Sequence, residues 1–171
     1  MQDKKISIGI LGATGMVGQR FIQLLQGHPW FEIAWLAASE RSEGKVYGEA
    51  VRWRMKTPLP ERIAAMPVSP ATPDGAPKAI FAALDSGPAK ELEPLFAASG
   101  RAVVTNSSAF RMVPDVPLVV PEVNPDHIVL LERQKVDIEE SLAELKRAIT
   151  TIDEAFARAA RERAAAPAEA A

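Results

Sequence analysis

Apolar runs, a glycine-rich turn and a helical pattern follow one another in the first forty residues. Lys5–Leu11 is a short apolar run of strand length, and Phe31–Ala38 has the composition of a buried parallel strand. Between them, the segment Gln19–Gln26 continues an apolar pattern with helical spacing. The turn Gly12–Gly18 joins the first run to this helix. The pattern therefore predicts a βαβ unit.

The rest of the first 134 residues repeats this alternation less regularly. Prolines interrupt the stretch after the second strand and leave only Ile63–Val68 as a candidate edge strand. Lys78–Leu84 and Arg101–Thr105 are predicted strands, with a helix at Ala89–Ser99 between them, and Leu118–Val120 is the last predicted strand. Such alternation indicates an α/β fold with a Rossmann-like, doubly wound and mostly parallel sheet.

The composition changes near Gln134. All 10 glycines and all but one of the 14 prolines precede it, and the remainder is rich in Ala, Glu and Arg. We therefore predict a nucleotide-binding domain of residues 1–134 and a helical tail of residues 135–171. The tail carries an a/d heptad stripe of Ile138, Leu142, Leu145, Ile149, Ile152, Phe156 and Ala159. Three explanations remain open: the tail folds back on the domain, it forms a homo-oligomer through a coiled coil, or it is an accident of the reading frame.

Composition and charge narrow the classes of function. The 171 residues are 47% hydrophobic and 25% charged, with a net charge of -2, as in a soluble globular protein. This near-neutral charge provides no basic surface for binding nucleic acid. No apolar run reaches the ~20 residues that a membrane-spanning helix needs. The first residues lack the apolar core of a signal peptide, so a cytoplasmic location is expected. The absence of cysteine excludes disulfides, thiolate zinc sites and a cysteine nucleophile.

The glycine turn has the spacing G-x-x-G-x-x-G on Gly12, Gly15 and Gly18. In a dinucleotide-binding turn such glycines permit a tight bend, close approach of a pyrophosphate and close packing of helix on strand. The amides and the positive end of the helix dipole then face the phosphates. A tight strand-to-helix turn without a ligand is the alternative, but the flanking strand and helix favour nucleotide binding.

The residues after the second predicted strand bear on the choice between NAD and NADP. NAD-specific folds place an acidic residue there, whereas a 2′-phosphate needs cations and hydroxyls. Ser39, Arg41 and Ser42 suit the phosphate, with bidentate geometry from the guanidinium, although Glu40 leaves NAD open. NADP is therefore the predicted cofactor, and a solvated charged loop is the alternative.

Four segments together resemble the archaeal and fungal branch of aspartate-semialdehyde dehydrogenase. They are Gly12–Gly18, Ser39–Tyr47 ending in R-S-E-G-K-V-Y, T-N-S-S-A-F-R-M at 105–112, and V-P-L-V-V-P-E-V-N-P-D-H at 116–127. The resemblance covers about residues 4–134, which match the NADP-binding half of that family. It implies a part in the NADPH-dependent reduction of aspartyl phosphate to aspartate semialdehyde, in amino-acid biosynthesis.

The resemblance also implies roles for individual residues. It places cofactor phosphates against Thr14, Gly15, Met16 and Val17, and the 2′-phosphate against Ser39, Arg41 and Ser42. It places the nicotinamide side of the cofactor against Ser86 and Gly87. In the family, the arginine that matches Arg111 helps to hold the substrate phosphate, with the residue that matches Asn106 nearby.

The sequence departs from this family at Lys135, where the family continues toward an N-x-N-C segment with the nucleophilic cysteine. The resemblance therefore implies a chain truncated before that cysteine, without catalytic residues and inactive unless another chain supplies the thiol. No metal site is predicted, and His28 and His127 are expected to be surface or capping residues. Short-chain reductases share the glycine turn, but Tyr47 lacks the lysine four residues on that their chemistry needs. The alternative function is a non-catalytic nucleotide-binding module that self-associates through its tail.

Overall fold

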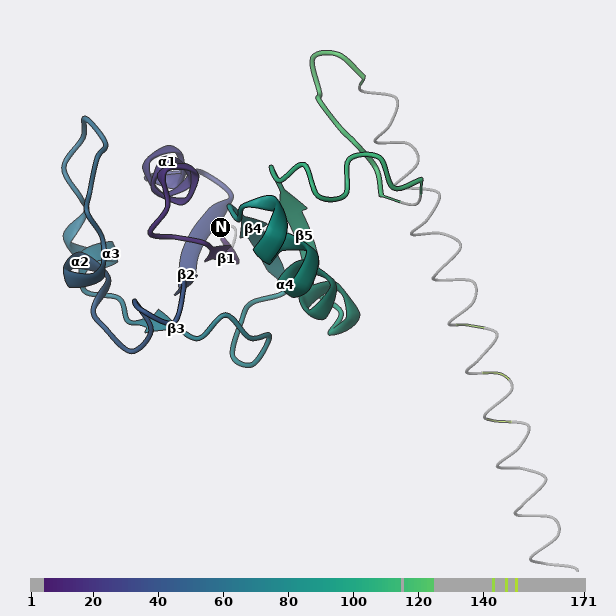
Figure 1. The fold of residues 1–171 in the computed structure, drawn as a ribbon, viewed down its shortest axis with the longest axis horizontal. Coiled ribbons are helices and arrows are strands. Elements are labelled where there is room, and N and C mark those ends of the chain that lie inside the picture. Colours follow the sequence, from purple (N-terminus) through teal and green to yellow (C-terminus); the bar gives the residue numbers. More distant parts are fainter. Residues whose placement is uncertain (1–4, 115, 125–142, 144–146, 148–149, 151–171) are drawn as a thin grey trace, which may run out of the picture. The chain divides into compact units, whose positions relative to one another are not determined.

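A computed structural model describes residues 5–114, residues 116–124 and the single positions 143, 147 and 150 of the chain (Figure 1). The chain divides into two compact units, residues 1–113 and residues 114–171. The first unit holds the sheet and all the predicted cofactor residues. The second contains the predicted last strand and the tail.

A five-stranded parallel sheet forms the centre of the first unit, with the strand order β3-β2-β1-β4-β5 (Figure 1). The strands are β1 (Ile6–Leu11), β2 (Phe31–Ala37), β3 (Val68–Ser69), β4 (Ala79–Ala82) and β5 (Ala102–Thr105). Leu11 pairs with both Ala37 and Ala82, and Ala82 pairs with Thr105. Four strands thus end in one row, and the loops that follow them start at the same edge of the sheet. The predicted Rossmann-like fold is confirmed.

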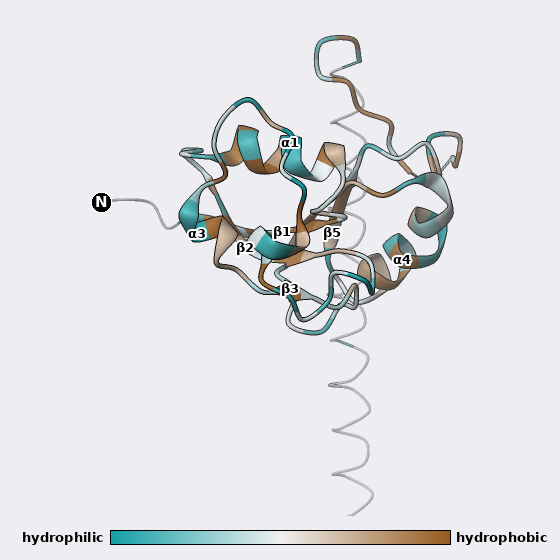
Figure 2. Cartoon of the chain, turned by 60° about the vertical axis from the view of Figure 1, so that its left-hand side comes forward, coloured by the Kyte–Doolittle hydropathy of each residue, from teal (hydrophilic) through white to brown (hydrophobic). Residues whose placement is uncertain are grey.

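Helices pack on both faces of this sheet because its strands alternate their side chains. The helices are α1 (Met16–Leu25), α2 (Tyr47–Ala50), α3 (Glu61–Ala64) and α4 (Ser86–Ala98). Ile8 and Ile10 belong to one buried cluster with Ile22 of α1, whereas Leu11 belongs to a second cluster with Phe96 of α4. α1 presents a hydrophobic side and a hydrophilic side, as its colouring shows (Figure 2). Two cores, one on each face, are what a doubly wound sheet requires.

The predicted edge strand Ile63–Val68 is mostly wrong. Its first residues belong to α3, which follows Pro60, and the amide of Ala64 donates to the Pro60 carbonyl. Pro67 has no amide proton to extend a ladder. Val68 and Ser69 pair with Leu36 and Ala37 of β2, and Pro67 forms only an isolated antiparallel bridge with Val46. The edge position was predicted correctly, but the strand is two residues long.

The predicted strand Leu118–Val120 is absent, because a side chain takes its backbone groups. The Val120 amide donates to Asn124 Oδ1 at 2.6 Å, and Asn124 Nδ2 donates to the Leu118 carbonyl at 2.6 Å. These bonds close a turn, since asparagine side chains often replace a backbone partner in this way. The P-E-V-N segment at 121–124 was not recognised in the sequence as the start of such a turn.

Little of the tail falls within the described residues. Ala143, Arg147 and Thr150 are helical and exposed, and Arg147 Nε donates to the Ala143 carbonyl at 3.3 Å. All seven residues of the predicted stripe and the boundary at 134/135 lie outside the described residues. Within the described part of the chain, no helix has the length and apolar character that crossing a membrane requires.

Candidate functional site

A cleft of about 540 Å³ opens at the carboxyl-terminal edge of the sheet. The loops after β1, β2 and β4 line it, and α4 contributes one wall. Its lining includes Gly12, Ser39, Arg41, Leu84 and Pro88. Ligands bind at this edge in open parallel sheets, because the loops there diverge at the point where the strand order reverses.

Gly12 and Gly18 are required by the packing of the glycine turn. Gly12 has a φ of 84°, and a Cβ there would lie 2.6 Å from the Ala83 carbonyl oxygen. A Cβ on Gly18 would lie 2.7 Å from Ala13 Cα and would collide with the Gly12 carbonyl oxygen. Gly15 is less constrained, since its Cβ would meet only the Gly12 oxygen at 3.4 Å. The turn therefore brings β1, β4 and α1 closer together than any side chain would allow.

The start of α1 leaves backbone amides free for a ligand. Gly15 is the N-cap, and its missing side chain leaves the helix uncapped. Within residues 14–18, which the structure describes, only the Gly15 amide forms a hydrogen bond to another backbone group. Met16 and Val17 are exposed, and the first turn contains no acidic side chain. Free amides at the positive end of a helix dipole form an anion site.

Two buried polar residues hold this turn from behind. Gln19 is 2% exposed, and its Nε2 donates to the Thr14 carbonyl at 2.9 Å while its Oε1 accepts the Arg54 amide at 2.8 Å. The fully buried Tyr47 donates its hydroxyl to the Ala13 carbonyl at 2.7 Å. Burial raises the pKa of the Tyr47 phenol above its ordinary value, so the hydroxyl remains a donor. Backbone carbonyls of the turn are thus satisfied, and the shape of the turn is fixed.

Sequence reasoning missed both residues. A glutamine in an amphipathic helix usually faces solvent, so nothing in the local pattern marks Gln19. Tyr47 is the chain's single tyrosine and lies in a polar, glycine-flanked segment, which was a usable sign of a buried anchor. Its partner, however, lies 34 positions away along the chain.

Only some of the predicted cofactor residues after β2 line the cleft. Ser39 and Arg41 are exposed and line it, as do Glu40 and Glu43. Ser42 is 8% exposed, and its amide donates to the Ser39 carbonyl at 2.8 Å. Ser42 thus shapes the turn that presents its neighbours, and its contact with a 2′-phosphate stays a prediction.

The loops after β4 and β5 meet at a pair of serines. Ser86 and Gly87 form the first turn of α4, three residues before the predicted start of that helix. Ser86 Oγ lies 2.8 Å from Ser108 Oγ. Arg111 Nη2 donates to the Asn106 carbonyl at 2.7 Å, so these two predicted substrate-phosphate residues are brought together. The residues predicted to face the nicotinamide and those predicted to hold the substrate phosphate therefore lie on neighbouring segments of the chain. The hydrogen bond between Ser86 and Ser108 joins these segments.

Glu93 is a buried acid behind these loops that sequence reasoning missed. It is 4% exposed on α4, and its Oε1 accepts the Thr105 hydroxyl at 2.7 Å. Burial raises the pKa of the Glu93 carboxyl above its ordinary value, and the Thr105 hydrogen bond partly offsets that rise. The signal was its spacing, since Ala89, Glu93 and Phe96 lie four and three residues apart, on one helix face.

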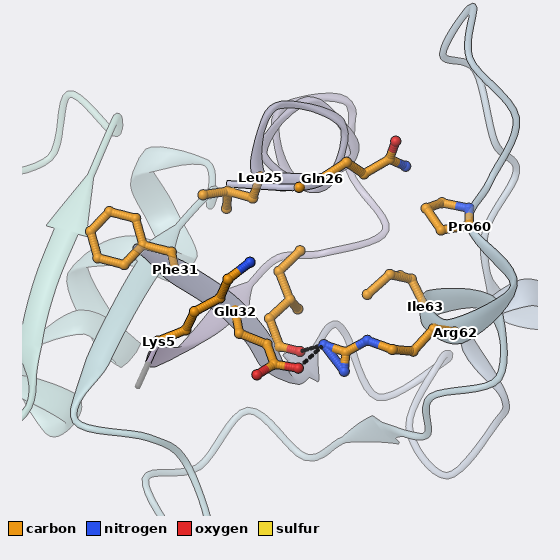
Figure 3. A pocket seen from close by; sticks show the side chains of 10 residues that line it. Lys5, Leu25, Gln26, Phe31, Glu32, Pro60, Arg62 and Ile63 are labelled. Atoms are coloured by element: carbon orange, nitrogen blue, oxygen red, sulfur yellow. Dashed lines mark hydrogen bonds and ion pairs between the residues drawn. The ribbon is translucent and has the colours of Figure 1, made fainter. Parts of the chain in front are cut away.

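A second cleft of about 540 Å³ opens near the amino-terminal ends of β1 and β2 (Figure 3). Its apolar wall includes Leu25 and Ile63. Arg62 Nη2 is held there by Glu32 Oε1 and by the Ile33 carbonyl, both at 2.8 Å. The Arg62 guanidinium is thus engaged within the protein, and the glycine turn lies at the other edge of the sheet.

His28 has a structural role, and His127 lies outside the described residues. The Nδ1 atom of His28 accepts the amides of Trp30 and Phe31, each at 3.2 Å, which fixes the turn before β2. In the described residues, histidine and acidic side chains form no group that could hold a metal ion.

Several aspartate-semialdehyde dehydrogenases match this chain over most of its length. An aspartate-semialdehyde dehydrogenase of Archaeoglobus fulgidus is 52% identical over 134 residues, which are 77% of this chain and 38% of that protein. The enzyme of the same name from Methanothermobacter thermautotrophicus is 49% identical over 132 residues, 76% of this chain and 38% of that protein. The chain thus spans less than two fifths of the length of these relatives.

A solved structure agrees with both the sequence match and the fold. The crystal structure of aspartate semialdehyde dehydrogenase with NADP from Candida albicans superposes with a TM-score of 0.73 at 45% identity. The match covers 75% of this chain and 37% of that one. The family model described as "semialdehyde dehydrogenase, NAD binding domain" matches residues 7–131, and with the glycine turn and parallel sheet in place the chain belongs to that family.

Proposed function

We propose that this chain binds NADP and forms the cofactor half of an oxidoreductase of the aspartate-semialdehyde dehydrogenase type. One observation carries the proposal: Gly12, which begins the turn that leads to the free amides at the start of α1, lines the same cleft as Ser39 and Arg41. An amide cradle suits a pyrophosphate, and a guanidinium with a neighbouring hydroxyl suits a 2′-phosphate. The NADP in the Candida albicans neighbour supports this choice of cofactor.

Each part of the site has a defined task under this proposal. The amides of Thr14, Met16 and Val17 would bind the pyrophosphate, while Gly12 and Gly18 let the backbone approach it. Bound NADP supplies a hydride acceptor or donor. The loop after β5 would hold the phosphate of an acyl-phosphate substrate, with Arg111 as its cation. Arg111 is exposed and therefore accessible to such a ligand.

The 171-residue chain supplies no thiol for covalent catalysis, because it contains no cysteine. Thioester formation needs a thiolate, and an unactivated serine hydroxyl is a much poorer nucleophile. We therefore propose that the chain binds cofactor but does not by itself reduce aspartyl phosphate or oxidise aspartate semialdehyde.

Calorimetry with NADP⁺ and NAD⁺, followed by an activity assay, tests this proposal. We expect binding of NADP⁺ in preference to NAD⁺, and no phosphate-dependent oxidation of aspartate semialdehyde. Absence of NADP⁺ binding would contradict the cofactor assignment. Turnover in a preparation shown to be free of host enzyme would contradict the catalytic part and would direct attention to Ser107 and Ser108.

The alternative function, a nucleotide-binding module that self-associates, rests on the tail. We propose domains of residues 1–134 and 135–171, with the apolar stripe from Ile138 to Phe156 buried against protein. Each large apolar side chain so buried contributes about 1.5–3 kcal/mol, more than helix propensity alone can supply. A cytoplasmic location is also part of the proposal, and fractionation of cells that express the chain tests it.

Removing the tail after Gln134 distinguishes the two arrangements. If the tail folds back, the full chain sediments as a monomer and the shortened chain melts at a lower temperature. If it pairs, the full chain sediments as a dimer or larger and the shortened chain is a folded monomer. Leu145→Asp, at the centre of the stripe, should reproduce the effect of removal. A monomeric full chain with the same melting temperature with and without its tail would show that the stripe is buried nowhere.

A further inference from the structure

A chain of hydrogen bonds leads from the buried Glu93 to the loop after β5. Thr105, the last residue of β5, donates its hydroxyl proton to Glu93 Oε1 at 2.7 Å. The same hydroxyl oxygen accepts the Ser107 amide at 3.0 Å, and Ser107 Oγ accepts the Ala109 amide at 3.3 Å. The backbone amides of Ser107 and Ala109 are thereby fixed by side chains. These bonds bracket Asn106, which lies between Thr105 and Ser107 in the sequence.

The direction of these bonds depends on the carboxylate. A hydroxyl has a single proton, and an ionised carboxylate can only accept one. Glu93 therefore keeps the Thr105 proton pointing toward α4, which leaves the lone pairs of the oxygen for the Ser107 amide. Without an acceptor at position 93, the hydroxyl is free to rotate and the loop loses the constraint.

Fold stability alone does not account for an acid at position 93. Burying a carboxylate is costly unless it is paired or hydrogen-bonded. Within the part of the chain that the structure describes, Glu93 takes part in no ion pair, so no cation neutralises it. Its neighbours on the same helix face, Ala89 and Phe96, are fully buried and apolar. An apolar side chain would suit this position between helix and sheet, whereas only an acceptor can orient Thr105.

The loop that Glu93 restrains contacts the cofactor side of the site. Ser108 Oγ lies 2.8 Å from Ser86 Oγ, in the first turn of α4, and the Asn106 carbonyl accepts Arg111 Nη2 at 2.7 Å. Ser86 is the residue proposed to face the nicotinamide side. Displacement of the loop would therefore move Ser86 and Arg111 and leave Arg41, on the loop after β2, unaffected.

We propose that Glu93 is a positioning residue, which acts through Thr105 to hold the loop of residues 106–111 in the geometry that receives the nicotinamide half of the dinucleotide. This inference rests on the proposed function, because it presupposes that the cleft binds NADP. It implies that Glu93 affects the binding of the nicotinamide half of NADP and not of the adenosine half.

Two ligands that differ in that half provide the test. NADP⁺ carries the nicotinamide ribose, whereas adenosine 2′,5′-bisphosphate keeps only the adenosine and its two phosphates. Calorimetry of the full chain is done with both ligands on wild type, Glu93→Ala and Thr105→Val. We expect a three- to tenfold loss of affinity for NADP⁺ in each variant, the range of one lost hydrogen bond, and an unchanged affinity for the bisphosphate.

Conservative variants separate positioning from damage to the fold. Glu93→Gln keeps an acceptor oxygen and Thr105→Ser keeps the hydroxyl, so both should bind NADP⁺ within twofold of wild type. Should Glu93→Ala fail to fold, the nearly isosteric Thr105→Val and its control Thr105→Ser carry the same comparison. Melting curves confirm that each variant is folded before binding is measured.

Each remaining result has a distinct meaning. Equal losses for both ligands, unchanged NADP⁺ affinity in Thr105→Val, or equal affinity of wild type for the two ligands would each overturn the positioning role. A folded wild-type chain that binds neither ligand overturns the proposed function itself. A wild type that binds both while the variants lose neither overturns the role of Glu93 alone.

Discussion

Replacement of Gly18 by alanine should lower the free energy of unfolding by about 1–2 kcal/mol, although the position is helical. Alanine is favoured over glycine in a helix by up to about 1 kcal/mol. Against this, the new Cβ would lie 2.7 Å from Ala13 Cα and would collide with the Gly12 carbonyl oxygen. Overpacking costs about 1–3 kcal/mol, with the upper end expected here because both obstacles are backbone atoms that cannot rotate away. The clash therefore outweighs the propensity.

The measurement is thermal or urea unfolding, with Gly87→Ala as the matched control. For a protein of this size, each 1 kcal/mol corresponds to a shift in melting temperature of roughly 2–4 °C. Gly87 is also in a first helical turn, but its Cβ would meet nothing within 4 Å. The control should be as stable as wild type or more stable by up to about 1 kcal/mol. If both variants are stabilised, the close packing of α1 on the glycine turn is wrong.

Arg41→Ala should weaken NADP⁺ binding by about ten- to a hundredfold and leave NAD⁺ binding unchanged. A charged hydrogen-bonding contact is worth about 1.5–3 kcal/mol, which converts to that range of affinity. NAD⁺ lacks the 2′-phosphate and so has nothing to lose at this position. The effect should shrink at high salt, since Arg41 is exposed and its charge is screened.

Calorimetry with both dinucleotides checks this expectation, and Arg20→Ala is the matched control. Arg20 is an exposed arginine on α1 that does not line the cleft. Its removal should change both affinities by less than twofold. Equal losses of NADP⁺ binding in the two variants would indicate a general effect of positive charge, and no loss in Arg41→Ala would remove Arg41 from the site.

The βαβ unit could be predicted from the sequence because the residues that determine it lie close together along the chain. The apolar run of β1, the glycines of the turn and the helical spacing of α1 all lie within about twenty residues. Parallel pairing then follows from the connection, since a helix between two strands brings their carboxyl ends to one edge. Gly12 and Gly15 could be located in the turn, and Arg41 after the second strand, for the same reason, because these positions follow from the order of elements in this unit.

Other features depended on contacts between distant residues and could not be predicted from local patterns. Tyr47 meets Ala13 across 34 positions, Gln19 meets Arg54 across 35, and Glu93 meets Thr105 across 12. A polar side chain stabilises the structure in this way only when folding buries it and brings its hydrogen-bond partner close. The hydrophobic pattern of the surrounding sequence does not indicate which polar side chains will be buried.

The errors in secondary structure have the same origin. An apolar run such as Leu118–Val120 becomes a strand only if a neighbouring strand supplies the ladder, and here Asn124 bonds its backbone instead. The sequence by itself determined the parallel α/β fold and the glycine turn, through local spacing and steric limits. Tertiary structure alone decided which buried polar groups support the site, because burial and hydrogen-bond partners exist only once distant segments have come together.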